Sequence, residues 1–187
     1  GYWSFDWYNS TGVFDNSTYN NFGTFNGGLG IDNITSGKFG LALTINQSTY
    51  VNATNSNFDV DTNESYSISF WMKRNQIGGT GWQSLIYRGS GNVWNINTNI
   101  LIHLDSNRIT VQNREITDTY HYYYGGTHLV DTANQWYHIV VVQKIGTANV
   151  SIYVNGKNCS IIGSDTWTGD VYDGSNIRIG KGTYNSF

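Results

Sequence analysis

Few residues in this 187-residue sequence could carry acid–base catalysis. The chain has 13 Asp and Glu residues, of which only Glu64 and Glu115 are glutamates. Retaining hydrolysis of a glycosidic bond needs two carboxyl groups about 5 Å apart on either side of that bond. The segment Asp59–Glu64 imitates such a pair, but Thr62 and Asn63 favour a turn where the strand would have to continue. We interpret the segment as a polar turn and predict that the protein is not an enzyme.

The single cysteine and the histidines also lack a catalytic or metal-binding context. Cys159 follows Asn158 in a short strand-like segment with no neighbouring group that would activate a thiol. Such a cysteine is typical of a small core or interface residue. The histidines have no paired spacing of the kind that holds zinc: His103, His121, His128 and His138.

Calcium is the one metal for which the sequence offers candidates. This ion binds six to eight oxygen atoms from carboxylates, amides and carbonyls. Two stretches bring such oxygens together: Asp165, Asp170, Asp173 and Asn176 in one, and Asp59, Asp61 and Asn63 in the other. Hydrated turns are the simpler interpretation of both stretches. We therefore expect no cofactor, with calcium at Asp165, Asp170 and Asp173 as the alternative.

Aromatic residues make up 16% of the sequence, and several occur where they could contact a ligand. Exposed Trp and Tyr rings are flat apolar platforms with a polar tip, which suits sugars. The candidates lie in Gly- and Asn-rich connections or in the Tyr-rich run 120–124: Trp82, Trp94, Trp167, Tyr122, Tyr123 and Tyr124. Alternate residues of the run must point to opposite sides. It is interpreted either as a loop folded over a sheet edge or as a contact surface.

The remaining aromatic residues are expected mainly in the core. Trp3, Phe5, Phe70 and Trp136 fall in strand-like segments. Trp71 has the opposite phase from Phe70 and shares a serine-rich face. We expect a neighbouring strand to cover Trp71, with a position lining a groove as the alternative.

Eight Asn-x-Ser/Thr sequons form a second theme. They begin at Asn9, Asn16, Asn33, Asn46, Asn52, Asn63, Asn149 and Asn158. The sequence has 24 Asn and 36 Ser plus Thr, so chance alone gives about four or five such triplets. The excess is modest, but six sequons lie within the first 63 residues, mostly in predicted turns. Covalent N-glycans on several of them would explain how a chain with 12% charged residues stays in solution.

The elements that position these residues have the pattern of β-strands. The chain has no Pro and 22 Gly, so its turns must use Gly, Asn and Asp. Helical periodicity is absent, whereas period-two alternation is frequent. Strands are predicted at residues 2–7, 39–45, 65–73, 83–88, 100–105, 108–112, 136–142, 148–154 and 176–181. Many short strands at this spacing predict an all-β, two-sheet antiparallel sandwich.

Composition excludes several classes of protein. The net charge is −3 and there is no basic run, so nucleic acid is not an expected partner. No apolar run approaches the roughly 18 residues of a membrane span. One cysteine cannot form an internal disulfide. The chain begins at Gly1 without a signal peptide, so we expect a mature product or an excised fragment.

Six segments across nearly the whole chain resemble, in order, strands of laminin-G-like, concanavalin A-like jelly-roll domains. Gly37–Leu43 is similar to the “GkfG-AL” strand, Ser67–Lys73 to “tiSfWvk”, and Gln135–Val140 to “qWhHva”. The others are residues 1–6, 152–157 and 177–180. The resemblance implies two stacked antiparallel sheets with about a dozen strands, and a hydrogen-bonded structural role for His138. Laminarinase-like relatives are glycosidases, but Asp59 stands here where their motif begins with Glu.

The resemblance implies binding or scaffolding more often than catalysis. We predict an extracellular or cell-surface, non-enzymatic structural or adhesive glycoprotein domain, a subunit or repeat of an assembly or filament. The alternative is a carbohydrate-binding, lectin-like module of a larger secreted enzyme or adhesin. The expected partners are other copies or neighbouring domains, N-glycans and, in the alternative, a carbohydrate ligand.

The end of the chain suggests how copies could meet. In the family, the strand that resembles residues 176–181 is followed by one more strand, which pairs beside the first. This sequence ends at Phe187, so we expect one domain, 1–187, without that strand. An unpaired edge beside Tyr2–Trp7 would be a template for another chain. Either the chain is cut from a longer multidomain protein, or a strand from a neighbouring copy fills the gap. A head-to-tail contact through the terminal segments and the 120–124 run would build a filament unless the rotation closes.

Overall fold

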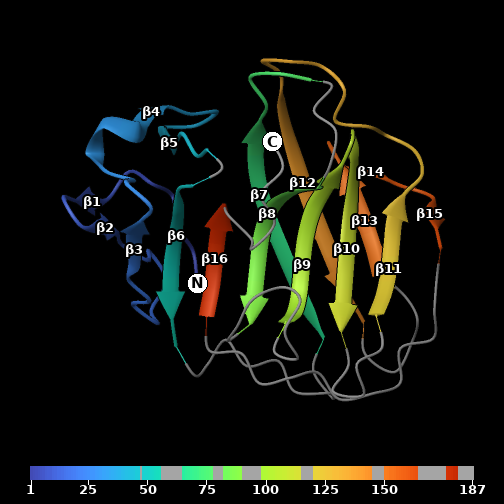
Figure 1. The fold of residues 1–187 in the computed structure, drawn as a ribbon, viewed down its shortest axis with the longest axis horizontal. Coiled ribbons are helices and arrows are strands. Elements are labelled where there is room, and N and C mark those ends of the chain that lie inside the picture. Colours follow the sequence, from blue (N-terminus) through green and yellow to red (C-terminus); the bar gives the residue numbers. More distant parts are fainter. Residues whose placement is uncertain are drawn as a thin grey trace.

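The computed structural model has an all-β fold built from antiparallel sheets (Figure 1). It describes residues 1–46, 48–55, 65–77, 82–89, 98–114, 120–144, 150–163 and 176–180. These ranges contain 16 strands and one 3-10 turn, Ile31–Asn33. The expected all-β sandwich is therefore confirmed.

The larger sheet has ten strands in the order β1-β2-β3-β6-β16-β8-β9-β10-β11-β15. In that order their bounds are Tyr8–Asn9, Gly12–Val13, Gly23–Asn26, Tyr50–Thr54, Asn176–Gly180, Trp82–Gly89, Thr98–Asp105, Arg108–Arg114, Tyr120–Gly125 and Ile161–Ile162. Strand β16 pairs with both β6 and β8, and it thereby joins the N-terminal strands to the centre of the sheet.

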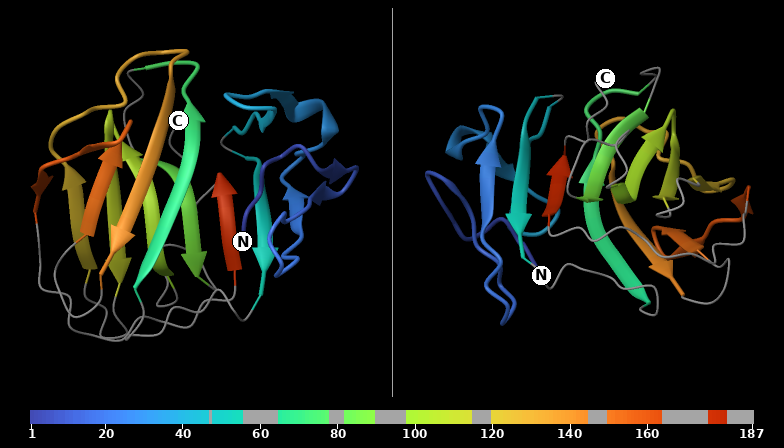
Figure 2. Two further views of the ribbon diagram at one scale, coloured as in Figure 1. Left: turned by 180° about the vertical axis from the view of Figure 1, so that it is seen from behind. Right: turned by 60° about the horizontal axis from the view of Figure 1, so that its bottom comes forward.

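A four-stranded sheet packs against one part of the larger sheet, as the two opposite views in Figures 1 and 2 show. Its order is β14 (Lys157–Asn158), β13 (Val150–Val154), β12 (Trp136–Gln143) and β7 (Tyr66–Lys73). A separate hairpin pairs β4 (Ile34–Ser36) with β5 (Leu41–Leu43). The expected turns are also confirmed: Ser106 and Asn155 have positive φ angles of 58° and 52°, and Gly156 has 76°.

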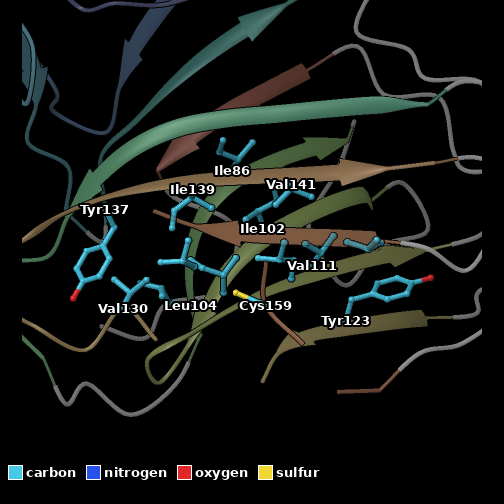
Figure 3. Packing of buried hydrophobic residues seen from close by; sticks show 14 of the residues in the cluster. Ile86, Ile102, Leu104, Val111, Tyr123, Val130, Tyr137, Ile139, Val141 and Cys159 are labelled. Carbon is cyan, nitrogen blue, oxygen red and sulfur yellow. The ribbon is translucent and has the colours of Figure 1, made fainter. Parts of the chain in front are cut away.

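Strict alternation along the strands builds the core between the two sheets. Along β12, every second residue is buried and the residues between are half-buried, and β11 and β13 repeat this pattern. Ile139 and Val141 of β12 meet Ile102 of β9 and Val111 of β10, and all four side chains are fully buried (Figure 3). Burial of each such aliphatic side chain stabilises the fold by roughly 1.5–3 kcal/mol. Cys159 joins this cluster, and burial raises the pKa of its thiol.

Two aromatic predictions about this core need correction. Trp136 lies opposite Lys73 on the outward face of the four-stranded sheet, because the inward position is taken by Tyr137. No neighbouring strand covers Trp71 fully: its side chain is 40% exposed, and its ring contacts His138 of the paired strand β12 and Phe39. Both faces of residues 136–142 are apolar, so alternation alone does not identify the inward one.

The predicted first strand, Tyr2–Trp7, is wrong. Phe5 has a φ angle of +66°, which ends extended structure, and the first strand is β1 at Tyr8–Asn9. In place of the expected ladder, residues 2–7 accept backbone bonds from the amides of Asn16 (to Tyr2, 2.7 Å) and Phe14 (to Trp7, 2.9 Å) and also bond through side chains. The amide of Tyr2 donates to the Asp15 carboxylate (2.7 Å), and the Trp3 indole donates to the carbonyl of Asn21 (2.8 Å). Residues 2–7 form no strand, so the unpaired strand edge that we expected beside them is not formed. Self-association through the chain ends stays a prediction.

Asp15 organises this N-terminal segment. Its carboxylate is nearly buried and accepts five hydrogen bonds of 2.7–3.0 Å from Tyr2, Ser17 and Asn21. Burial by itself raises the pKa of Asp15, but the backbone N–H groups of these three residues outweigh burial and hold the pKa well below its usual range.

We expect Asp15→Asn to lower the free energy of unfolding by about 2–4 kcal/mol at pH 7, because hydrogen bonds to a buried charge are lost. A carboxyl with a depressed pKa stabilises the fold above its unfolded pKa, near 3.8, and this stabilisation is lost as the pH falls further. The difference between the proteins should therefore shrink below pH 3.8. Urea unfolding measures it, with the exposed Asp131→Asn as control; equal losses for both variants would contradict the role of Asp15.

Candidate functional site

The outward face of the larger sheet brings several predicted contact residues together. Strand β11 directs Tyr120, Tyr122 and Tyr124 outward, away from the core. Their neighbours on β10 are set by the register: Tyr124 lies opposite Thr110, and Tyr122 lies opposite Gln112. The run 120–124 is thus a strand inside the sheet, and its interpretation as a loop over the edge is wrong.

Four rings form what we call the aromatic ridge: Trp82, Tyr120, Tyr122 and Tyr124. The ring centroids of Tyr120 and Tyr122 are 6.2 Å apart, and those of Tyr122 and Tyr124 are 6.1 Å apart, with interplanar angles of 16° and 13°. The Trp82 ring lies 6.0 Å from that of Tyr122. All four side chains are half-buried. The ridge therefore combines apolar ring surface with phenol and indole groups at its tips.

On the same face, beside the tyrosines and under the Trp82 ring, lies a row of buried polar side chains, the polar floor, made of Ser84, His103, Thr110 and Gln112. Residues 84, 103, 110 and 124 follow one another across β8, β9, β10 and β11 by direct pairing. The Trp82 ring stacks on His103 with centroids 4.7 Å apart. The Ser84 hydroxyl, both ring nitrogens of His103, the Thr110 hydroxyl and Oε1 of Gln112 are buried without a hydrogen-bond partner in the described part of the chain.

Such orphaned groups are rare because each costs about 1–3 kcal/mol. Five orphaned atoms on adjacent strands are therefore an unusual concentration of unused hydrogen-bonding capacity. A few polar groups beneath apolar and aromatic surface are typical of ligand sites. The ridge and the floor together are our candidate site.

A cationic group extends the same face toward β6. Arg178 of β16 lies between two rings, with its guanidinium carbon 5.2 Å from the Tyr50 ring centroid and 5.4 Å from that of Tyr87. Its Nε donates to Oδ1 of Asn52 at 3.3 Å. These contacts hold the arginine flat along the sheet, beside the candidate site.

The sequence identified only part of this site. Trp82, Tyr122 and Tyr124 do come together, whereas Tyr123 is fully buried in the core, so its assignment to a contact surface is corrected. Trp94 and Trp167 lie outside the described residues. The polar floor was not predicted from the sequence. The signal was there, because His103, Thr110 and Gln112 stand in the polar phase of otherwise apolar strands.

The other predicted sites are described only in part. The calcium candidates Asp165, Asp170 and Asp173, and the segment Asp59–Glu64, lie outside the described residues. Within the described ranges, no three His, Cys, Asp or Glu residues are grouped so that they could hold a metal ion. Of the sequons, Asn9, Asn16, Asn46 and Asn158 are exposed, Asn33 and Asn52 are partly buried, and Asn63 and Asn149 are not described.

Comparison with a family model and with solved structures shows which proteins this fold resembles. The chain belongs to the concanavalin A-like lectin/glucanases superfamily, since a laminin-G-type model of that superfamily matches residues 46–186. No curated protein matches the chain. In the described residues we find no helix with the length and apolar character of a membrane span.

The fold is similar to that of several solved binding domains. The binding domain of Paraclostridial Mosquitocidal Protein 1 matches with a TM-score of 0.74 and 14% identity, over 96% of this chain and 44% of that one. The binding domain of botulinum neurotoxin serotype C1 matches with a TM-score of 0.69 and 20% identity, over 93% and 41%. The binding domain of botulinum neurotoxin DC in complex with SialylT matches with a TM-score of 0.61 and 17% identity, over 89% of this chain and 40% of that one. The chain thus spans less than half the length of these solved chains.

His103 gives the candidate site a pH signature. Burial without a partner lowers the pKa of His103 from 6.5 to about 4. Between pH 6.5 and pH 4, His103 binds a proton in the unfolded chain but not in the folded protein. The free energy of unfolding therefore falls as the pH drops through this range. The full effect is roughly 3 kcal/mol. We expect His103→Gln to flatten this dependence, measured by urea unfolding across the range, and the exposed His128→Gln to leave it unchanged. A slope that survives in His103→Gln would refute the assignment.

Proposed function

We propose that this chain is a non-enzymatic, extracellular carbohydrate-binding domain, and that the aromatic ridge contacts the sugar. The single observation that carries the proposal is the ridge of four rings above a floor of polar side chains with unused hydrogen-bonding capacity. A sugar presents C–H faces and hydroxyl groups side by side. Aromatic rings with polar tips match both kinds of group.

The charges on this face support binding rather than hydrolysis. A glycosidase of the usual kind needs two carboxyl groups on either side of the scissile bond. Strands β8 to β11, which carry the candidate site, contain one carboxylate, Asp105. The solved binding domain of botulinum neurotoxin DC with SialylT adds the support of a similar fold in a binding role.

Replacing the rings tests the proposal directly. A glycan array first identifies a bound sugar, and calorimetry then measures its affinity. We expect Trp82→Ala and Tyr122→Ala each to weaken binding by about 2 kcal/mol, roughly 30-fold, because each ring supplies contact area in the centre of the site. Trp7→Ala removes an exposed aromatic side chain (65% exposed) from the N-terminal segment and should leave binding unchanged. Either an array without a bound sugar or affinities unaffected by both ridge variants would refute the proposal.

The extracellular assignment rests on the sequons. The side chain of Asn9 is exposed, and its Oδ1 accepts hydrogen bonds from the amide (2.8 Å) and the hydroxyl (2.9 Å) of Thr11, the third residue of its sequon. Asn46 accepts from the amide of Ser48 in the same manner (2.9 Å). These turns present the amide nitrogens of both asparagines at the surface, where glycan can be attached.

Glycosylation has a direct readout in mass. Protein from the native source should exceed 21.0 kDa by several glycan units. Asn9→Gln should remove one unit without loss of the fold, since glutamine keeps an amide but not the sequon. A native mass equal to that of the polypeptide would refute this part of the proposal.

A further inference from the structure

The four-stranded sheet has an outward face of its own, on the opposite side of the core from the aromatic ridge. Four residues of β7 that point outward are exposed: Ser67, Ser69, Trp71 and Lys73. On β12, Trp136 lies opposite Lys73 and His138 lies opposite Trp71. Because diagonal neighbours in an antiparallel pair are about 7–8 Å apart, Trp71 and Trp136 stand side by side.

Each of these tryptophans carries a lysine over its ring. Nζ of Lys38 lies 5.5 Å from the Trp71 ring centroid, and Nζ of Lys73 lies 5.1 Å from that of Trp136. Both distances fall within the range of cation–π attraction, which is weak at exposed sites. The two ammonium groups therefore rest on the rings but are easily displaced.

The support of Trp71 is rigid. Its ring stacks on His138 with centroids 4.9 Å apart and an interplanar angle of 21°, and Oγ of Ser69 lies 2.8 Å from Nε2 of His138. Phe39, which is 70% exposed, meets Trp71 edge to face at 5.6 Å. The indole is thus fixed in orientation before any ligand arrives.

Lys38 and Phe39 reach this face from the turn between β4 and β5. Gly40 has a φ angle of +59°, which the turn needs, and its carbonyl accepts from the amide of Gly37 (2.9 Å). The amide of Leu41 donates to Oδ1 of Asp6 at 2.7 Å. That carboxylate is therefore engaged at the base of the turn.

The charge of this face is opposite to that of the whole chain. The sequence has a net charge of −3, yet strands β7, β12, β13 and β14 contain no Asp or Glu. On the outward face β7 contributes Lys73, and the β4–β5 turn adds Lys38. A surface that combines cations with flat rings is complementary to an anion that also has an apolar face.

We propose that the outward face of the four-stranded sheet is a second binding surface, which takes an acidic saccharide bearing carboxylate or sulfate groups. The anionic group draws the ammonium of Lys38 or Lys73 off its indole and pairs with it, and the C–H face of the sugar takes the place of the ammonium on the ring. In the free protein the lysines shield the apolar rings from water. The rings lie across the sheet, beside polar Ser69, which suits a sugar better than a lipid surface.

Hexasaccharides of defined charge test this proposal. The probes are a heparin hexasaccharide (sulfate and carboxylate), a hexagalacturonate (carboxylate only) and neutral maltohexaose. We expect at least one acidic probe to bind with an affinity that falls as salt rises, since exposed charge pairs are screened. Lys38→Ala and Lys73→Ala should each weaken binding about 3- to 10-fold through loss of a charge-assisted hydrogen bond, and Trp71→Ala should weaken it at least as much. The exposed Arg108→Ala removes the same charge from the other sheet and should have no effect.

Two results would overturn the proposal, and two others would assign the face to a different ligand. Failure of both acidic probes to bind at low salt, or equal losses in Arg108→Ala and Lys38→Ala, overturns the proposal. Tighter binding to phosphatidylserine vesicles or to polyglutamate than to either acidic hexasaccharide would assign the face to a membrane or to an acidic peptide instead. Lys38 is at the tip of an exposed turn, so its variant tests the site even if Trp71→Ala fails to fold. Trp82→Ala should leave acidic binding intact, which separates this surface from the aromatic ridge.

Discussion

Burial of one apolar face from each sheet is the constraint on which the rest of the structure depends. Pleated strands direct successive side chains to opposite sides, so committing Ile139 and Val141 to the core forces His138 and Val140 outward. The same rule on β11 buries Tyr123 and turns Tyr122 and Tyr124 outward. Both outward faces are consequences of one core, and a shift of one residue in register would exchange them.

The two outward faces differ in chemistry because the strands differ in composition. The larger sheet places polar side chains such as His103 and Gln112 beneath half-buried rings. The smaller sheet places an exposed indole, Trp71, and a half-buried one, Trp136, beside lysines and has no carboxylate in its four strands. A protein with 12% charged residues relies on such local arrangements for specificity, since its overall field is weak.

Asp15 and His103 are both buried ionisable groups, but their surroundings differ. Asp15 keeps its charge because five hydrogen bonds outweigh the cost of burial, whereas His103 has no hydrogen-bond partner in the described residues, and burial lowers its pKa. The first arrangement stabilises the N-terminal segment. The second leaves hydrogen-bonding capacity beneath the aromatic ridge, as ligand sites often do at some expense of stability.

The sequence by itself determined the fold class, most strand positions and the glycine- and asparagine-based turns, because alternation and turn chemistry are local properties of the backbone. Only the tertiary structure decided which of two apolar faces lies inward at Trp136, and that residues 2–7 are anchored to Asp15 and Asn21 instead of forming a strand. It also decided that Trp82 lies over His103 and Lys38 over Trp71. Those contacts depend on strand order and on loop-borne side chains, and neither is encoded in the period of any single strand.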